Sequence, residues 1–265
     1  MKKHFNNKTS INKWITHLFF PLMLCVQAIV FAQDTTETPS TKKYALLFSL
    51  SNNGQIKDEI TNFYAAFNIS SELSSVESNA LTYNLFYTYQ LNLNYNIGLK
   101  LAYTKRSETT TIAEIIAQND ETKINQTIFG TSFFIRRKIN LHPYLILNSG
   151  VEIPLFLVGN FTSKSINDND FFTKQETFKK DGGIVVGLNN ITSLTLLISK
   201  TFSFNLNASF GLLYYNLGDE LELNSITFNK STNEVQNVQQ KEDKKKLKKI
   251  ELSNAELFFG IGIHF

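Results

Sequence analysis

Four charged residues stand out because each falls among small or polar residues that alternate with large apolar ones: Lys100, Arg136, Glu152 and Glu256. Charges enclosed in a narrow protein interior must be paired or hydrated. If the alternation belongs to a closed sheet, each glutamate could meet Lys100 or Arg136 across the interior. Such a cluster could line a gated path for ions or form a salt-bridged polar plug, and we favour the plug.

A second set of residues has the types needed for nucleophilic catalysis: Ser149, Glu152 and the two histidines after residue 32, His142 and His264. A catalytic triad requires mutual hydrogen-bond reach. In an extended strand Ser149 points away from the face of His142 and Glu152, and ten residues separate those two by about 30 Å. These groups cannot converge, so we expect no enzyme. We also expect no metal site and no cofactor, because no His/Cys cluster has ligand spacing and no glycine-rich loop precedes a helix.

The elements that carry these residues follow a period of two. From Leu81 to Tyr103 every odd position is large and apolar, whereas the even positions are mostly polar or small. Strict alternation predicts strands with one apolar face. A stretch of this length requires a turn that preserves the phase, and Asn92-Leu93-Asn94 is suited to it because Asn tolerates the left-handed conformation. Ser199-Lys200-Thr201 and a polar turn near Lys138–Asn140 are predicted to act in the same way.

The pattern predicts eight strands, at 43–54, 80–91, 95–106, 124–137, 141–157, 183–198, 202–217 and 250–265. The connections between them alternate between long and short. Long loops on one side and short turns on the other are typical of outer-membrane β-barrels, in which the short turns are periplasmic. We therefore predict an all-β, antiparallel, up-and-down transmembrane barrel.

The apolar face could point outward to lipid or inward, as in a soluble ligand-binding barrel. The interior of an eight-stranded barrel is only wide enough for ordinary side chains to fill it. The many Leu, Phe and Tyr side chains of the apolar phase would not fit there, whereas the small and polar residues of the other phase would. An external apolar face of this size would cause a soluble protein to aggregate, so lipid is the expected surrounding.

The first 32 residues read as a cleavable signal peptide. Four lysines and no acid lie in this segment, followed by the apolar run LFFPLMLCVQAIVFA, which is short for a bilayer span. A single membrane anchor is the alternative. The only Cys and the only Trp belong to this segment. Because its lysines account for the net charge of +3, the remaining chain gives no electrostatic case for nucleic-acid binding. Residues 33–42 form a polar lead-in that we expect to be disordered.

The last residues, AELFFGIGIHF, form an apolar phase of Phe259, Ile261, Ile263 and the terminal Phe265. With the signal peptide ending in FAQ and the eight strands, this segment resembles the small outer-membrane β-barrel family of Bacteroidetes, which is similar in architecture to OmpA- and OmpX-type barrels. The resemblance covers residues 43–265 as a pattern. It implies export to the periplasm and insertion by the barrel-assembly machinery, which reads the last strand as its signal. It does not imply a ligand.

Two loop segments are candidates for contacts with partners. Residues 241–251, KEDKKKLKKIE, have an excess of lysine that could bind lipopolysaccharide phosphates, although a solvated loop stem is the simpler interpretation. The first long loop holds Phe63, Tyr64 and Phe67, which could form a contact surface. Segments 55–80 and 218–249 could also add strands outside the membrane.

The sequence as a whole predicts a monomeric outer-membrane barrel in contact with membrane lipids and lipopolysaccharide, with a structural or surface-interaction role in its external loops. A small pore or transport accessory is the first alternative. A lipid-modifying enzyme is the second.

Overall fold

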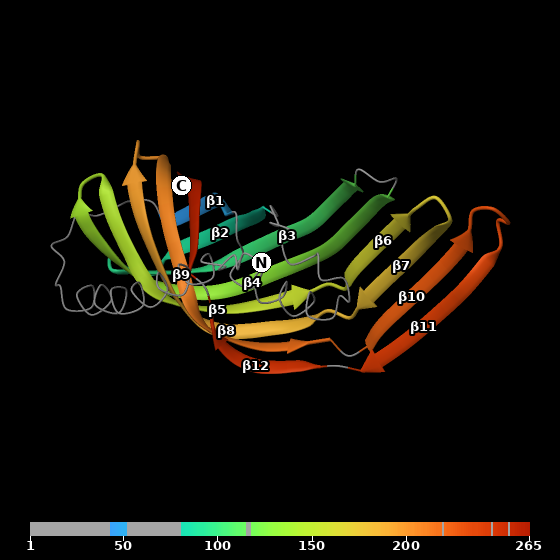
Figure 1. The fold of residues 1–265 in the computed structure, drawn as a ribbon. Coiled ribbons are helices and arrows are strands. Elements are labelled where there is room, and N and C mark those ends of the chain that lie inside the picture. Colours follow the sequence, from blue (N-terminus) through green and yellow to red (C-terminus); the bar gives the residue numbers. More distant parts are fainter. Residues whose placement is uncertain (1–42, 52–80, 115–117, 219, 245, 254) are drawn as a thin grey trace, which may run out of the picture.

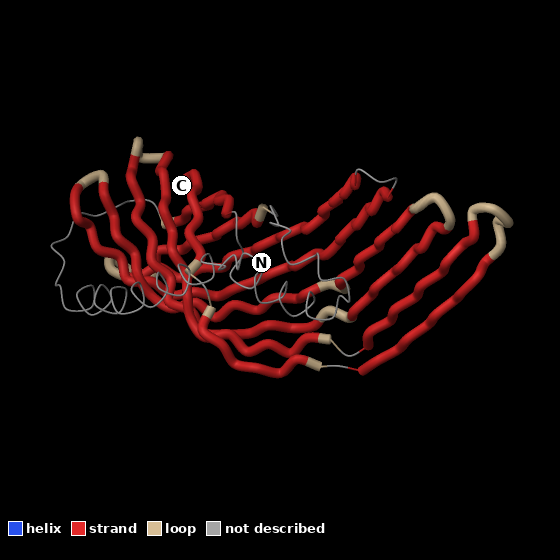
Figure 2. The backbone as a smooth tube through the Cα atoms, in the orientation of Figure 1, coloured by secondary structure: helices blue, strands red, loops and turns tan. Residues whose placement is uncertain are grey.

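The structure, a computed structural model, describes residues 43–51, 81–114, 118–218, 220–244, 246–253 and 255–265. The predicted signal peptide, the lead-in 33–42 and Phe63, Tyr64 and Phe67 lie outside these ranges. The described residues contain no helix long and apolar enough to cross a membrane. They form strands joined by turns (Figure 2).

Thirteen strands form one sheet, and their bounds are β1 Tyr44–Ser51, β2 Thr82–Gln90, β3 Tyr95–Glu114, β4 Gln118–His142, β5 Leu145–Val158, β6 Phe161–Asp168, β7 Phe172–Lys180, β8 Gly183–Leu197, β9 Phe202–Leu217, β10 Glu220–Asn229, β11 Val235–Lys244, β12 Leu247–Leu252 and β13 Glu256–His264. Every pairing between them is antiparallel. The all-β, antiparallel prediction is confirmed, and the predicted number of eight strands is too low.

A closed ring of strand pairs lies within this sheet. β1 pairs with β2, β2 with β3, β3 with β4 and β4 with β5. The ring continues from β5 to β8, from β8 to β9 and from β9 to β13, and β13 pairs back with β1. These are the strands that the period-two pattern located, and we refer to them as the ring. In it, Leu46 of β1 lies opposite Ile263 of the last strand.

The extra strands extend the sheet beyond the ring. β3 and β4 continue to Glu114 and Gln118, where the sequence predicted a loop. The far half of β4 pairs with β6, β6 with β7, β7 with β10 and β10 with β11. Figure 1 shows these strands running side by side past the ends of the ring strands. Two predicted long loops are therefore hairpins, and the segment 218–249 does add strands.

Side-chain oxygens hold two of the short turns together. Asn92 Oδ1 accepts hydrogen bonds of 2.9 Å from the backbone N–H groups of Asn94 and Tyr95. Ser199 Oγ accepts in the same way from Thr201 and Phe202, at 3.1 and 3.0 Å. Both predicted turns are confirmed, but the left-handed reasoning was wrong, because the only non-glycine residue with positive φ in the described chain is Asn233. The predicted turn at Lys138–Asn140 was also wrong, since β4 runs on to His142.

Candidate functional site

The outer face of the ring is apolar and open to the surroundings. Phe259 and Phe48 are 69% and 66% exposed. Outward residues of other ring strands are at least half exposed, among them Leu188, Phe204, Leu212, Ile153 and Leu99. Most inward neighbours of these residues on the same strands are buried. A continuous band of exposed Leu, Ile and Phe around a closed ring is far larger than the apolar patches of soluble monomers.

The ring interior contains a buried ion pair. Lys100 Nζ of β3 lies 2.8 Å from Oε1 of Glu152, which projects from β5, two strands away. Both side chains are almost fully buried, with 2% and 0% of their surface exposed. Ser209 of β9 donates a hydrogen bond of 3.1 Å to the other carboxylate oxygen of Glu152. The pair therefore connects strands from different sides of the interior.

Aromatic rings pack around this pair. Phe86 and Phe258 are fully buried, and their ring centroids lie 5.5 Å apart. The ammonium of Lys100 lies 5.7 and 5.5 Å from their centroids, within the range of cation–π attraction. The prediction of an interior filled only by small and polar residues was wrong at this level. Large inward rings are accommodated because glycine lies beside them: a Cβ at Gly98 would come within 2.4 Å of Phe134.

The other two predicted interior charges lie in the same space with different partners. Glu256 Oε1 accepts a 2.7 Å hydrogen bond from Ser51 Oγ and interacts electrostatically with Lys100. Arg136 donates to Ser193 Oγ and to Thr88 Oγ1, both at 3.3 Å, and its guanidinium carbon lies 4.3 Å from the ring centroid of Phe134. The structure thus brings Lys100, Glu152 and Glu256 together, while Arg136 contacts neutral groups.

The residues considered for catalysis do not form a constellation. Ser149 Oγ lies 2.9 Å from Thr192 Oγ1, and Glu152 is occupied by Lys100. His142 is exposed and accepts a 3.4 Å hydrogen bond from the backbone of Tyr144, whereas His264 Nε2 lies 2.9 Å from Ser203 Oγ. Among the described residues, no group of three or more His, Cys, Asp or Glu side chains could hold a metal ion.

The hairpins beyond the ring form a surface of a different kind. β11 is the last strand of the sheet and pairs only with β10 in the described chain, and every one of its residues but Asp243 is exposed. Val235 and Val238 on it are 53% and 59% exposed. An unpaired strand edge offers backbone N–H and C=O groups to an extended segment of another chain. Segment 218–249 was predicted to be able to add strands, but the position of this edge could not be predicted, because the alternation fades in 235–244.

A contact at the hairpin tips holds the β6–β7 and β10–β11 hairpins together. Lys230 Nζ lies 2.9 Å from Asp168 Oδ1, and the Lys230 backbone N–H donates to Phe171 O at 3.0 Å. Thr173 Oγ1 also donates to Asp168 Oδ1. These bonds lower the pKa of the Asp168 carboxyl, with the Thr173 hydroxyl as the largest cause and the Lys230 bond next.

The last strand closes the ring against the first. Phe259, Ile261 and Ile263 of β13 face outward, with 69%, 55% and 44% exposure. The N–H and C=O of Phe265 both bond to Tyr44 at 3.0 Å, and the two rings stack with centroids 6.0 Å apart. Recognition of this strand by the barrel-assembly machinery stays a prediction.

The lysine-rich segment 241–251 falls on two strands. Lys241 and Lys244 lie on the exposed β11, and Lys244 Nζ approaches Glu220 Oε1 at 3.5 Å. Lys249 on β12 forms an ion pair with Glu251. Part of the lysine excess is thus balanced by local carboxylates, and binding of lipopolysaccharide to this segment stays a prediction.

No family model matches the chain, and no curated protein matches it in sequence. The family resemblance suggested by the last strand therefore stays an expectation. Among solved structures, Ail, the attachment invasion locus protein of Yersinia pestis, covers 84% of this chain with 97% of its own length, at 12% identity and a TM-score of 0.31. CarO of Acinetobacter baumannii covers 86% of the chain with 99% of its own, at 7% identity and the same TM-score of 0.31. Because the sequence identities and TM-scores are this low, these similarities do not bear on the function of the chain.

Proposed function

We propose that the chain is an integral outer-membrane β-barrel with a surface-interaction role carried by the hairpins beyond its ring. The membrane location is supported by the contrast between the apolar outer face of the ring and the charged groups in its interior. The ring exposes a band of Leu, Ile and Phe, while it buries Lys100 and Glu152 inside. A soluble protein has the opposite arrangement, with apolar side chains inside and charges outside. The arrangement of the ring is stable where lipid surrounds the outer face.

The orientation follows from the two ends of the barrel. Short turns such as 92–94 lie at one end, and the paired hairpins of β6–β7 and β10–β11 lie at the other (Figure 1). Barrels of this kind keep their short turns in the periplasm. The hairpin end is therefore the external one, and the terminal Phe265 lies on the periplasmic side.

Cysteine labelling on intact cells tests location and orientation together. The sole cysteine, Cys25, lies in the predicted signal peptide, so a single introduced thiol reports its own position. A membrane-impermeant maleimide should label Ser231→Cys at the tip of the β10–β11 hairpin, and should label Leu93→Cys in a short turn only after the cells are broken. Both variants should migrate differently on a gel before and after heating, as a folded barrel does. Equal labelling of the two on intact cells would overturn the orientation, and mature protein recovered soluble without detergent would overturn the membrane location.

The interaction role is supported by the open edge of β11. The structure shows how to remove it without opening the ring, because Leu217 pairs with Leu247 and a short turn can join β9 directly to β12. A chain in which a single Asn replaces residues 219–246, so that Gly218 and this Asn form a two-residue turn, should insert and keep its heat-dependent migration. It should fail to restore the outer-membrane composition of a strain from which the gene has been deleted, whereas the full chain restores it. Full restoration by the shortened chain would place the role in the barrel and not in this hairpin.

A further inference from the structure

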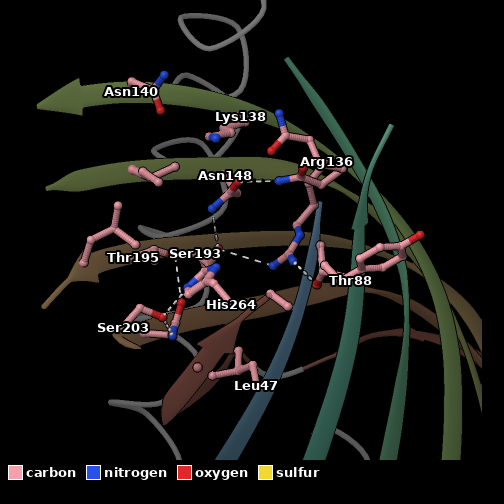
Figure 3. A pocket seen from close by; sticks show the side chains of 18 of the residues that line it. Leu47, Thr88, Arg136, Lys138, Asn140, Asn148, Ser193, Thr195, Ser203 and His264 are labelled. Atoms are coloured by element: carbon pink, nitrogen blue, oxygen red, sulfur yellow. Dashed lines mark hydrogen bonds between the residues drawn. The ribbon is translucent and has the colours of Figure 1, made fainter. Parts of the chain in front are cut away.

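A cavity of about 460 Å³ opens at the short-turn end of the barrel. Its walls come from the first residues of β1, β3, β5 and β9 and the last residues of β2, β4, β8 and β13. Figure 3 shows these side chains gathered around the opening, with Arg136 and Lys138 on one side and Ser203 and His264 on the other. This volume lies in the range of pockets that hold small organic ligands.

The charge of the cavity wall has one sign. Lys43, Arg136, Lys138 and Lys200 line it together with His142 and His264, and no Asp or Glu is found among the described residues of the lining. Deeper in the ring, by contrast, the buried Lys100 is matched by a carboxylate. Convergent cations in a concave, partly enclosed space attract anions more strongly than the same charges on an open surface.

Arg136 has donor capacity left for a ligand. Its side chain is 5% exposed, its two terminal nitrogens donate to neutral hydroxyls at 3.3 Å, and its Nε has no hydrogen-bond partner among the described residues. The carboxylate that acts on it electrostatically, Glu152, is itself bonded to Lys100. A buried guanidinium held only by long neutral bonds is stabilised by an anion, and its planar donor geometry suits phosphate and carboxylate oxygens.

The polar side chains around Arg136 are already held in place. Asn96 donates to Asn148 at 3.1 Å, and Asn148 donates to the same Ser193 hydroxyl that Arg136 contacts. On the opposite wall Thr195 bonds to Asn205 at 2.7 Å, and Asn205 bonds to Ser203, the partner of His264. These linked bonds fix the wall before a ligand arrives, which lowers the ordering cost of binding.

We propose that this cavity binds a small organic anion with at least two negative charges, in the first instance a phosphate monoester. Four cations, of which Arg136 and Lys138 are buried, favour a dianion over a monocarboxylate, and the volume exceeds what a bare inorganic ion would fill. Arg136 and Lys138 hold the phosphate oxygens, and the uncharged hydroxyl and amide groups of the opposite wall contact the organic part. The proposal rests on the ring geometry alone and holds whether or not the surface role of the hairpins does.

Isothermal titration calorimetry of the full mature chain in an uncharged maltoside detergent tests the site. Glycerol 3-phosphate should bind at one site per chain, more weakly as salt is added, since screening reduces attraction between charges. Glycerol should not bind, and inorganic phosphate should bind more weakly than the ester. Arg136→Gln should weaken binding by about tenfold or more, which is what one lost charge-assisted hydrogen bond corresponds to.

Two further variants keep the test decisive. Lys200→Gln changes an exposed turn residue of the cavity, so it should weaken binding even if Arg136→Gln fails to fold. Lys164→Gln removes an exposed charge on β6, outside the cavity, and should leave binding unchanged. Absence of binding in the wild type, or equal weakening by Lys200→Gln and Lys164→Gln, would overturn the proposal. Inorganic phosphate binding as tightly as the ester would show a free-phosphate site and contradict the organic ligand.

Discussion

Lys100 Nζ and Glu152 Oε1 lie 2.8 Å apart inside the ring, although a whole strand, β4, separates the strands that carry them. The contact is possible because inward side chains of a narrow barrel reach across its interior. It fixes the two residues within an apolar layer made by Phe86 and Phe258. The ion pair and the rings together fill the middle of the barrel.

Breaking this pair from one side should destabilise the barrel strongly. Glu152→Gln or Lys100→Met leaves one buried charge unmatched, at a cost of about 3 to 5 kcal/mol. The double variant, which removes both charges of the pair, should be more stable than either single variant. Urea unfolding of the protein in lipid vesicles measures all three, with the exposed Lys241→Gln as the control. A double variant as unstable as the sum of the two single ones would show that the residues do not interact.

The filled interior predicts that the barrel does not conduct ions. Phe86, Phe134 and Phe258 are fully buried at the level of the ion pair, so a continuous water path would have to displace packed rings. Purified protein added to a planar lipid bilayer should give no steady conductance steps. A known porin reconstituted in the same way serves as the positive control. Steady steps from the wild-type chain would favour the pore alternative.

The Asn92 side chain should be worth more to stability than its exposed position suggests. Its Oδ1 accepts two backbone hydrogen bonds that hold the turn between β2 and β3. Asn92→Ala removes this acceptor and with it both hydrogen bonds, with an expected loss of about 1 kcal/mol. Asn92→Asp, which keeps an acceptor at the same place, should lose less. Equal unfolding midpoints for Asn92→Ala and the wild type would rule out this role.

The contact at the hairpin tips should weaken in acid. The pKa of Asp168 is lowered in the folded chain, so its contribution is fully present above the ordinary value of 3.8 and is lost as the pH falls through the lower folded value. The protection factors of the Phe171 and Thr173 amides, which are corrected for the slower intrinsic exchange in acid, should fall in that acid range. Asp168→Asn should exchange faster at neutral pH and show no such transition. A wild-type profile that matches the variant throughout would contradict the prediction.

The alternation predicted the bounds of the ring strands closely. Along its whole length, each of these strands has one face that contacts the surrounding medium and one face that contacts the interior. β9, for example, was predicted at 202–217 and spans Phe202–Leu217. Segment 218–249 was predicted only to be able to add strands, and the bounds of β11 could not be predicted because almost all of its residues are exposed, so the strand shows no alternation between a buried and an exposed face. The Lys100–Glu152 pair was among the predicted pairings, because both residues occupy the polar positions of the alternation, which face the interior. Large inward rings such as Phe134 and Phe156 were missed because the glycines beside them, Gly98 and Gly130, leave the space that these rings occupy.

The ladder between β3 and β4 continues without interruption from Tyr95 opposite Arg137 to Glu114 opposite Gln118. At about 3.3 Å per residue, its 20 residues extend for about 60 Å, roughly twice the hydrocarbon thickness of a bilayer. One end of this ladder belongs to the barrel and the other carries the neighbouring hairpins. Under the proposed function, a molecule bound at the far end would be held at a defined height above the lipid by a stiff support, and the length of the ladder would set that height.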